Sequence, residues 1–147
     1  DKWVSLHEKF KTTGQMKHIL FYCAVGTALL CGCHESLEKR AQREAREYTE
    51  KYCPTPVQNY TRTDSVVFDI ATKTYHYYCS ATGELDDKKV FELNKGKLTD
   101  ALLANVKENT AFRAYKEEGF AFQWTVRSDK NKQTVYYDRK FTPKDYK

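Results

Sequence analysis

The hydrophobic and polar positions of the chain change period several times, and each change predicts a new element. Residues 35–52 contain no Gly or Pro, and apolar side chains recur there at steps of four and three, which predicts an amphipathic helix. Pro54 should end this helix, because proline lacks the amide hydrogen and disfavours helix in the preceding residue. The apolar stripe is thin and consists of Leu37, Ala41, Ala45, Tyr48 and Tyr52.

Two pairs of alternating segments predict strands. In residues 65–70 the side chains of Val66, Phe68 and Ile70 should lie on one face of a strand. Residues 74–81 follow after a connection that is too short for a parallel crossover. These two segments should therefore form an antiparallel hairpin. Residues 120–127 alternate most regularly, and residues 134–141, after a polar connector, should be their hairpin partner.

A second helical region is expected between the hairpins. Apolar residues recur at helical steps from Leu98 to Tyr115, with Asn109-Thr110 as a break or kink and Gly119 placed as a C-terminal cap. Residues 90–93 are compatible with a short extended or helical piece. The predicted order of elements is helix, hairpin, helix, hairpin, which corresponds to two copies of an α-β-β unit. We therefore expect an α+β fold with an α-β-β duplication, a four-stranded antiparallel sheet and two helices on one face.

The segment from Met16 to Cys33 has the order of a bacterial secretory signal. Met16 is followed by the basic Lys17 and by an apolar run over residues 19–30, which is shorter than the roughly 20 residues of a membrane span. A buried core helix is the alternative, but it would have no reason to end in Leu-Cys-Gly-Cys after a basic start. Residues 1–15 would then be upstream or cloning-derived residues, and a short cytoplasmic tail is the other interpretation.

The tetrapeptide Leu30-Cys31-Gly32-Cys33 resembles the lipobox of bacterial lipoproteins. The resemblance implies a lipoprotein signal peptide over residues 16–32, cleavage after Gly32, and diacylglycerol on Cys33. It leaves residues 33–147 as one α+β domain, which is long enough for a single hydrophobic core. Beyond the lipobox, the chain is similar in general appearance to small envelope lipoproteins of gut Bacteroidetes. This likeness implies a lipid-anchored protein of the bacterial cell envelope, in the outer membrane, and transfers no catalytic residues.

Charge says little about partners, whereas the cysteines point to one pairing. The chain has a net charge of +5, and its basic and acidic residues are mixed along the sequence, as where Lys88 and Lys89 follow Asp86 and Asp87. No basic stripe forms, so we expect no nucleic-acid partner. After cleavage and lipidation only Cys53 and Cys79 remain as thiols. In an exported domain they predict a disulfide rather than a metal site, and no CxxC spacing or other metal or cofactor motif occurs.

The search for catalytic residues yields only generic candidates. His76 has no evident orienting partner beyond Asp64, Asp69 and Ser80, and no phosphate loop or nucleophile elbow is present. The aromatic residues of the expected sheet form a candidate binding surface for a protein, a peptide or a glycan, since tyrosine contacts such partners at low entropy cost. The alternative is that tyrosine simply favours strands. The tyrosines concerned are Tyr75, Tyr77, Tyr78, Tyr136 and Tyr137.

Neighbouring strand residues face opposite sides of a sheet, so each of the pairs 77–78 and 136–137 should put one ring on each face. The sequence therefore predicts a non-enzymatic binding or protein-interaction module that is anchored to the membrane through lipid on Cys33. A small hydrolase or transferase using His76 is the alternative, and a purely structural envelope component is a third.

Overall fold

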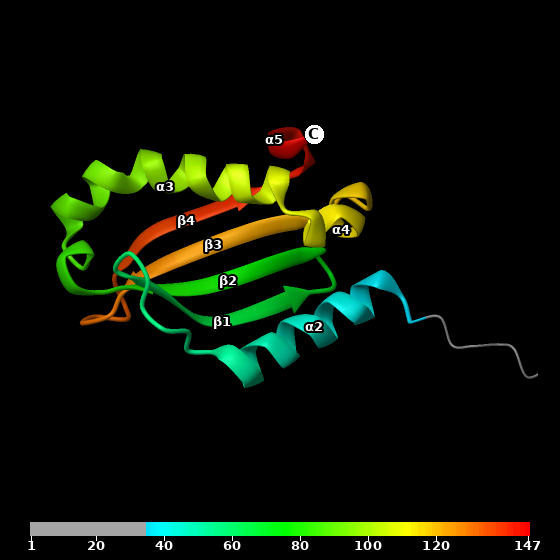
Figure 1. The fold of residues 1–147 in the computed structure, drawn as a ribbon, viewed down its shortest axis with the longest axis horizontal. Helices are drawn as coiled ribbons and strands as arrows, with labels where there is room; N and C mark the ends of the chain where they lie inside the picture. Colours follow the sequence, from blue (N-terminus) through cyan, green and yellow to red (C-terminus); the bar gives the residue numbers. More distant parts are fainter. Residues whose placement is uncertain (1–34) are drawn as a thin grey trace, which may run out of the picture. The chain divides into compact units, whose positions relative to one another are not determined.

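We describe residues 35–147 in a computed structural model of the protein (Figure 1). The predicted signal peptide and Cys33 lie outside the described residues. The first half contains α2 (Leu37–Tyr52), β1 (Thr61–Asp69), β2 (Thr74–Ala81) and the 3-10 turn η2 (Gly83–Leu85). The second half contains α3 (Lys88–Glu108), η3 (Thr110–Phe112), α4 (Arg113–Glu117), β3 (Ala121–Ser128), β4 (Val135–Phe141) and α5 (Pro143–Tyr146).

The four strands form one sheet in the order β1-β2-β3-β4, which confirms the expected α+β class and the four-stranded sheet. The two hairpins β1/β2 and β3/β4 are antiparallel as expected. The central pair β2/β3 is parallel, in contrast to the fully antiparallel sheet that the hairpins alone had indicated. The reason is the connection: α3, η3 and α4 carry the chain back to the starting end of β2, so β3 runs in the same direction.

The hydrophobic core lies on one face of the sheet, and α2, α3, α4 and α5 all contact side chains of that face. Its members are largely aromatic, and the face opposite carries polar side chains. Placing both main helices on one face agrees with the expectation. The strand residues of the core are Val66, Phe68, Tyr75, Ala81, Phe122, Trp124, Val126, Tyr137 and Phe141.

Helix α2 lies very close to the sheet because the residues of its contact stripe are small. Ala41 and Ala45 are completely or almost completely buried, and the hydroxyl of Tyr75 donates to the Ala41 carbonyl at 3.2 Å. Thr49 Oγ1 donates to the carbonyl of Val66 and accepts from its N–H, both at 2.8 Å. One hydroxyl thus satisfies the outward backbone groups of the edge strand β1 at this position, which would otherwise be open to another strand.

Helix α3 is longer than its apolar period predicted. It begins at Lys88, where the Asp87 side chain accepts hydrogen bonds from the first-turn N–H groups of Lys89 and Val90. The uncertain piece at residues 90–93 therefore belongs to this helix. The break expected at Asn109 is confirmed, since α3 ends at Glu108. Gly119, with φ of +77°, follows the end of α4 in the left-handed conformation that a C-terminal cap requires.

Candidate functional site

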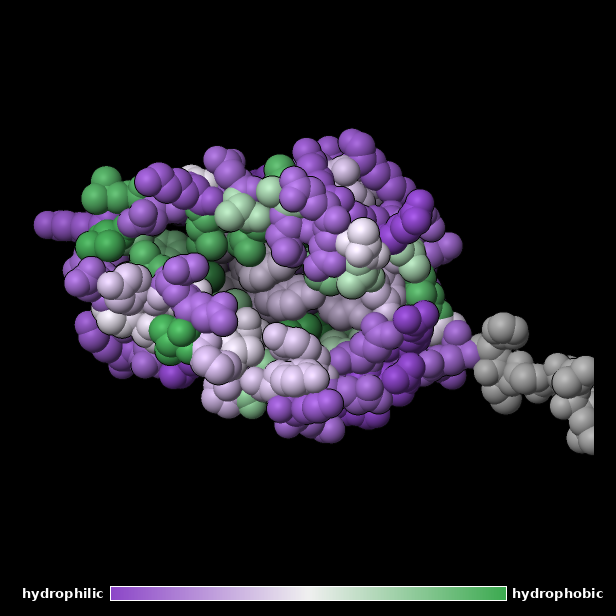
Figure 2. Space-filling view, in the orientation of Figure 1, coloured by the Kyte–Doolittle hydropathy of each residue, from purple (hydrophilic) through white to green (hydrophobic). Residues whose placement is uncertain are grey.

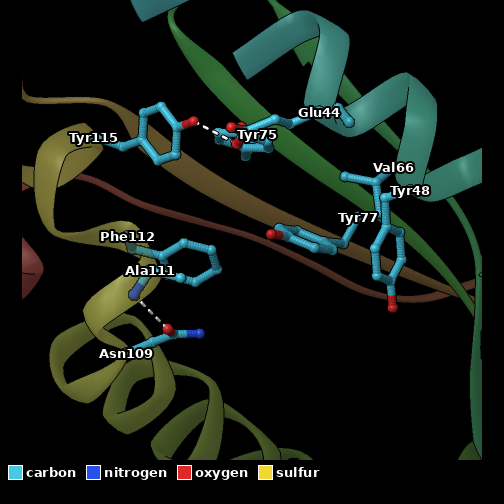
Figure 3. Close-up of a pocket in the computed structure, with 10 residues that line it drawn as sticks. Glu44, Tyr48, Val66, Tyr75, Tyr77, Asn109, Ala111, Phe112 and Tyr115 are labelled. Carbon is cyan, nitrogen blue, oxygen red and sulfur yellow. Dashed lines mark hydrogen bonds between the residues drawn. The ribbon is translucent and has the colours of Figure 1, made fainter. Parts of the chain in front are cut away.

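A hollow of about 400 Å³ lies on the helix-covered face of the sheet. We call it the groove. One side is formed by α2, the other by the segment that joins the end of α3 to α4, and the floor by β1 and β2 (Figure 3). Figure 2 shows the molecule hollowed between the hydrophilic surface of α2 and the more hydrophobic surface of α3. Its lining residues are Glu44, Ala45, Tyr48, Val66, Tyr75, Tyr77, Asn109, Ala111, Phe112 and Tyr115.

The floor of the groove is aromatic and rigid. The Tyr77 ring stacks on Trp124 with centroids 4.6 Å apart and an interplanar angle of 7°, and Tyr75 contacts Tyr115 edge-on at 5.2 Å. Burial raises the pKa of both Tyr75 and Tyr77, so both hydroxyls stay protonated. In Figure 3 the hydroxyl of Tyr77 points into the open space of the groove. The floor therefore offers flat apolar surface with a hydroxyl at its centre.

A hydrogen-bonded carboxylate joins the two walls at one end. The Tyr115 hydroxyl donates to Glu44 Oε2 at 2.6 Å, and Arg40 Nε donates to Glu44 Oε1 at 2.7 Å. Partial burial raises the pKa of Glu44, but the hydrogen bonds from Tyr115 and Arg40 outweigh this effect and lower the pKa overall. Glu44 is therefore ionised at neutral pH and holds α4 against α2.

The second wall is formed where α3 ends. Asn109 caps the η3 turn, with its side-chain oxygen accepting from the Ala111 N–H at 2.9 Å, and the Phe112 ring lies 4.7 Å from the Phe122 ring. The break at Asn109 thus turns the chain so that Ala111 and Phe112 line the groove. A signal for this wall was present in the sequence as the interruption of the apolar period, but nothing in the pattern indicated which side of the turn would face a cavity.

The chemistry of the groove fits binding better than bond cleavage. Its lining combines aromatic and small side chains with one carboxylate that is already neutralised by Arg40, and it holds no histidine, cysteine, lysine or serine. Within residues 35–147, no group of three or more metal-binding side chains is brought together. In the same part of the chain no helix has the length and hydrophobicity needed to cross a bilayer.

The five predicted binding tyrosines do not form one surface. Tyr75 and Tyr77 are in the floor of the groove, while Tyr78 lies on the opposite face, where its ring stacks on His76. The expectation of one ring on each face thus holds for the pair 77–78. It does not hold for the pair 136–137, because both rings contact Phe91 of α3, at centroid distances of 5.2 and 6.5 Å. The strand register of β4 shifts here, so strict alternation is lost.

His76, the residue of the alternative enzymatic hypothesis, lies on the sheet face opposite the groove. Its Nε2 is 2.8 Å from the Thr125 hydroxyl. Burial lowers the pKa of His76, with a smaller opposing effect from Asp138. Of the acids and serine considered with it, Asp64 and Ser80 are hydrogen-bonded to each other, and Asp69 binds the turn residue Thr72 at 2.7 Å. The structure therefore gives these candidates separate structural roles.

Cys53 and Cys79 are both half-buried free thiols in this structure, so their predicted disulfide stays a prediction. They lie on neighbouring elements. Cys79 Sγ is 3.9 Å from the Thr63 hydroxyl, and Thr63 in turn exchanges hydrogen bonds with Thr55, two residues after Cys53. Burial raises the pKa of Cys79 to about 11, with a smaller contribution from Cys53.

Sequence reasoning missed most of the groove-lining residues outside the sheet. Tyr48 and Tyr52 had been placed on the buried stripe of the first helix, yet they are 40% and 52% exposed. The helical period does align them with Ala41 and Ala45, but both rings border surface hollows instead of the core. Tyr48 therefore overhangs the groove rather than entering the core.

Three comparisons place the chain among known proteins. A family model described as a domain of unknown function (DUF8479) matches residues 36–137. No curated protein matches the chain. Among solved structures, a candidate secreted protein from Pseudomonas aeruginosa is 14% identical with a TM-score of 0.63, over 77% of this chain and 99% of that one.

Two pilotins of type II secretion systems also share the architecture. EpsS from Vibrio vulnificus is 12% identical with a TM-score of 0.60, over 76% of this chain and 92% of that one. AspS from Vibrio cholerae is 13% identical with a TM-score of 0.54, over 74% and 91%. At these identities the likeness concerns the fold.

Proposed function

The chain belongs to the family described as a domain of unknown function (DUF8479), and from this premise we propose that it is a lipid-anchored envelope protein that binds a helical segment of a protein partner in the groove. The observation that carries the proposal is the groove itself, an aromatic hollow of about 400 Å³ over β1 and β2, between α2 and the segment that joins α3 to α4. Two structural neighbours are pilotins of type II secretion systems, and this likeness is compatible with a role in an envelope assembly.

The position of the groove favours a helix over an extended segment. β2 is an interior strand, paired with β1 on one side and with β3 on the other, so its backbone groups are already used within the sheet. An extended segment on the floor would find no strand edge to pair with and would leave its own backbone groups unsatisfied. A helix satisfies its backbone internally and needs only side-chain contacts.

The lining of the groove suits the apolar face of such a helix, because the rings of Tyr77 and Phe112 and the small side chain of Ala111 all border the hollow. The partner helix should be amphipathic, with apolar residues at steps of three and four towards Tyr77 and Phe112.

Membrane attachment through Cys33 is the second part of the proposal, and it is supported by the lipobox pattern of residues 30–33. Two or more acyl chains give stable attachment, whereas one chain is marginal. Replacing Cys33 with Ser should release the protein from the membrane fraction. If the Cys33→Ser chain stays membrane-bound and uncleaved, residues 19–30 act as a span and the lipoprotein assignment is wrong. The outer membrane and a likeness to lipoproteins of gut Bacteroidetes remain predictions.

The groove is tested by site-specific photo-crosslinking of the whole chain in bacterial cells. A benzophenone amino acid at Asn109 should form a discrete adduct, and mass spectrometry should map it to an amphipathic helix of the partner. The same probe at Gln123, on the opposite face of the sheet, is the matched control and should give no such adduct. Ala111→Arg, which fills the groove from an exposed position, should abolish the Asn109 adduct. Adducts from Gln123 that equal those from Asn109, or adducts that persist in Ala111→Arg, would overturn the groove assignment.

A further inference from the structure

We infer that the α4–α5 end of the domain is a contact surface for the anionic headgroups of the membrane that holds the chain. We call this the basic end and define it by Arg113, Lys116, Lys147 and the neighbouring Lys144. The inference deepens the proposed function and rests on the proposed lipid anchor. It begins from a second hollow, of about 370 Å³, which is separate from the groove and is lined by Arg113, Lys116, Glu117, Tyr146 and Lys147.

Positive charge in this hollow exceeds negative charge. Glu117 pairs with Arg113 at 3.4 Å, and both side chains are largely exposed. The ammonium groups of Lys116 and Lys147 instead donate to backbone carbonyls, of Lys107 at 2.6 Å and of Glu117 at 3.4 Å. Among the described residues neither ammonium forms an ion pair, so both charges remain available to an anion. The carbonyl contacts also hold the two lysines at the rim of the hollow.

The basic end is also the end at which the described chain begins. Tyr115 of α4 is bonded to Glu44 in the first half of α2, and Lys73, in the turn between β1 and β2, pairs with Glu38 at 2.9 Å. Glu35 itself binds Arg43 of α2 at 3.1 Å. Figure 1 shows α4, α5 and the start of α2 at the same end of the sheet. Two unrelated features, the unpaired lysines and the entry of the chain, therefore coincide.

The length of chain between anchor and domain makes this coincidence physically relevant. Only His34 lies between Cys33 and Glu35, and the two residue steps from Cys33 to Glu35 span about 7 Å even when fully extended. The field of an anionic membrane acts over about one Debye length, roughly 8–10 Å at moderate salt. An anchor on Cys33 would therefore hold the end of the sheet that carries Lys116 and Lys147 towards the membrane, and each cation that enters this field strengthens membrane contact roughly fivefold.

The opposite end of the sheet provides a matched comparison. There Arg62 is paired with Asp64 and with Asp129, both at 2.8 Å, and Lys132 also binds Asp129 at 2.8 Å. The cations of that cluster are already neutralised by the protein. An anionic surface would have to displace these carboxylates, whereas at the basic end it would meet lysines without acidic partners.

The test uses the whole chain, purified from bacterial membranes and reconstituted into two kinds of vesicle. One contains phosphatidylglycerol and phosphatidylethanolamine, and the other contains phosphatidylcholine alone. Amide hydrogen exchange over residues 111–118 and 142–147 should be several-fold slower in the anionic vesicles, and the difference should vanish in 0.5 M NaCl. Lys116→Gln/Lys147→Gln should lose the difference. Lys88→Gln/Lys89→Gln, which removes the same charge at the other end, should keep it.

Equal exchange in the two vesicle types, or equal loss in the two double variants, would overturn the inference. Protection by inorganic phosphate alone, without vesicles, would also overturn it, since the hollow would then be a site for soluble anions. If the chain is not recovered from membranes, the anchor proposal has failed. The soluble chain is then mixed with the same vesicles, and the basic end predicts co-sedimentation with the anionic ones that falls roughly 25-fold in Lys116→Gln/Lys147→Gln.

Discussion

Helices α2 and α3 cover the same face of the sheet, but they are held to it in different ways. α2 lies close through Ala41 and Ala45 and through the two hydrogen bonds of Thr49 to the edge of β1. α3 is kept away by large rings, because Phe91 rests on Tyr136 and Tyr137 of β4. Small residues thus produce a tightly packed wall and large residues a more distant one. Beside the tightly packed α2, a hollow remains over β1 and β2, and this hollow is the groove.

Phe91→Ala is expected to have the largest effect, because it removes the ring that supports α3. Phe91 is 1% exposed, and truncating a buried phenylalanine typically costs about 3–5 kcal/mol through lost transfer energy and a cavity. Chemical unfolding should show this loss. Leu93→Ala on the same helix is the control, since Leu93 is 83% exposed and should change stability by under about 0.5 kcal/mol. Similar losses in both variants would show that α3 does not rest on Phe91.

A disulfide between Cys53 and Cys79 would bind the end of α2 still more firmly to β2. In the chain-entropy model, closing the loop between residues 53 and 79 stabilises the fold by about 3–4 kcal/mol. Protein purified from the envelope without reductant should contain no free thiol at these positions, and reductant should lower its unfolding midpoint. Cys53→Ser is the control that should make the midpoint insensitive to reductant. Two titratable thiols in the native protein would rule the bond out.

The variants Thr49→Val and Thr99→Val each remove a threonine hydroxyl that bonds a helix to the sheet. Together they compare how strongly α2 and α3 are attached. Thr49→Val leaves the N–H and the carbonyl of Val66 without their partner, which should cost about 1–3 kcal/mol. Thr99 on α3 bonds the Tyr137 hydroxyl at 3.0 Å, so Thr99→Val leaves one group without its partner instead of two and should cost about 1 kcal/mol. Urea denaturation measures both. A greater loss for Thr99→Val would contradict the view that α2 is the more tightly bound helix.

Tyr115→Phe is expected to have the smallest effect and to depend on pH. It removes the hydrogen bond that helps to lower the pKa of Glu44 below its ordinary value of 4.5. A carboxylate with a lowered pKa stabilises the fold above about pH 4.5, and this contribution is lost as the pH falls through the folded-state value. The cost at pH 7 should be about 1 kcal/mol, because the Glu44 side chain is 37% exposed and solvent screens the interaction.

Thermal unfolding from pH 7 to pH 3 would measure this dependence. Wild type should lose more stability than Tyr115→Phe over that range, so the two should converge at low pH. Tyr48→Phe is the control. The Tyr48 hydroxyl makes no hydrogen bond among those of the described residues, so its removal should leave the pH profile unchanged. A difference between wild type and Tyr115→Phe that is constant with pH would show that Glu44 is not involved.

The sequence determined the elements of this domain because their signals are local. The run of residues 74–81 and the alternation of residues 120–127 predicted β2 and β3 closely, because aromatic and β-branched residues favour extended backbone locally. Asn109 and Gly119 marked real helix boundaries for the same reason, because capping depends on a few neighbouring residues. The four-stranded α+β class followed from the order of these elements.

Only the tertiary structure decided how the elements meet and where the groove lies. The direction of β3 beside β2 depends on the path of the whole connection through α3 and α4, which no local period records. The register shift in β4 turned Tyr136 and Tyr137 to the same helix, although strict alternation had separated them. Glu44 and Tyr115 are 71 residues apart in the chain and meet only because folding brings α2 to α4. A cavity is the space that packing leaves between distant segments, so its lining cannot be read from the periodicity of any one of them.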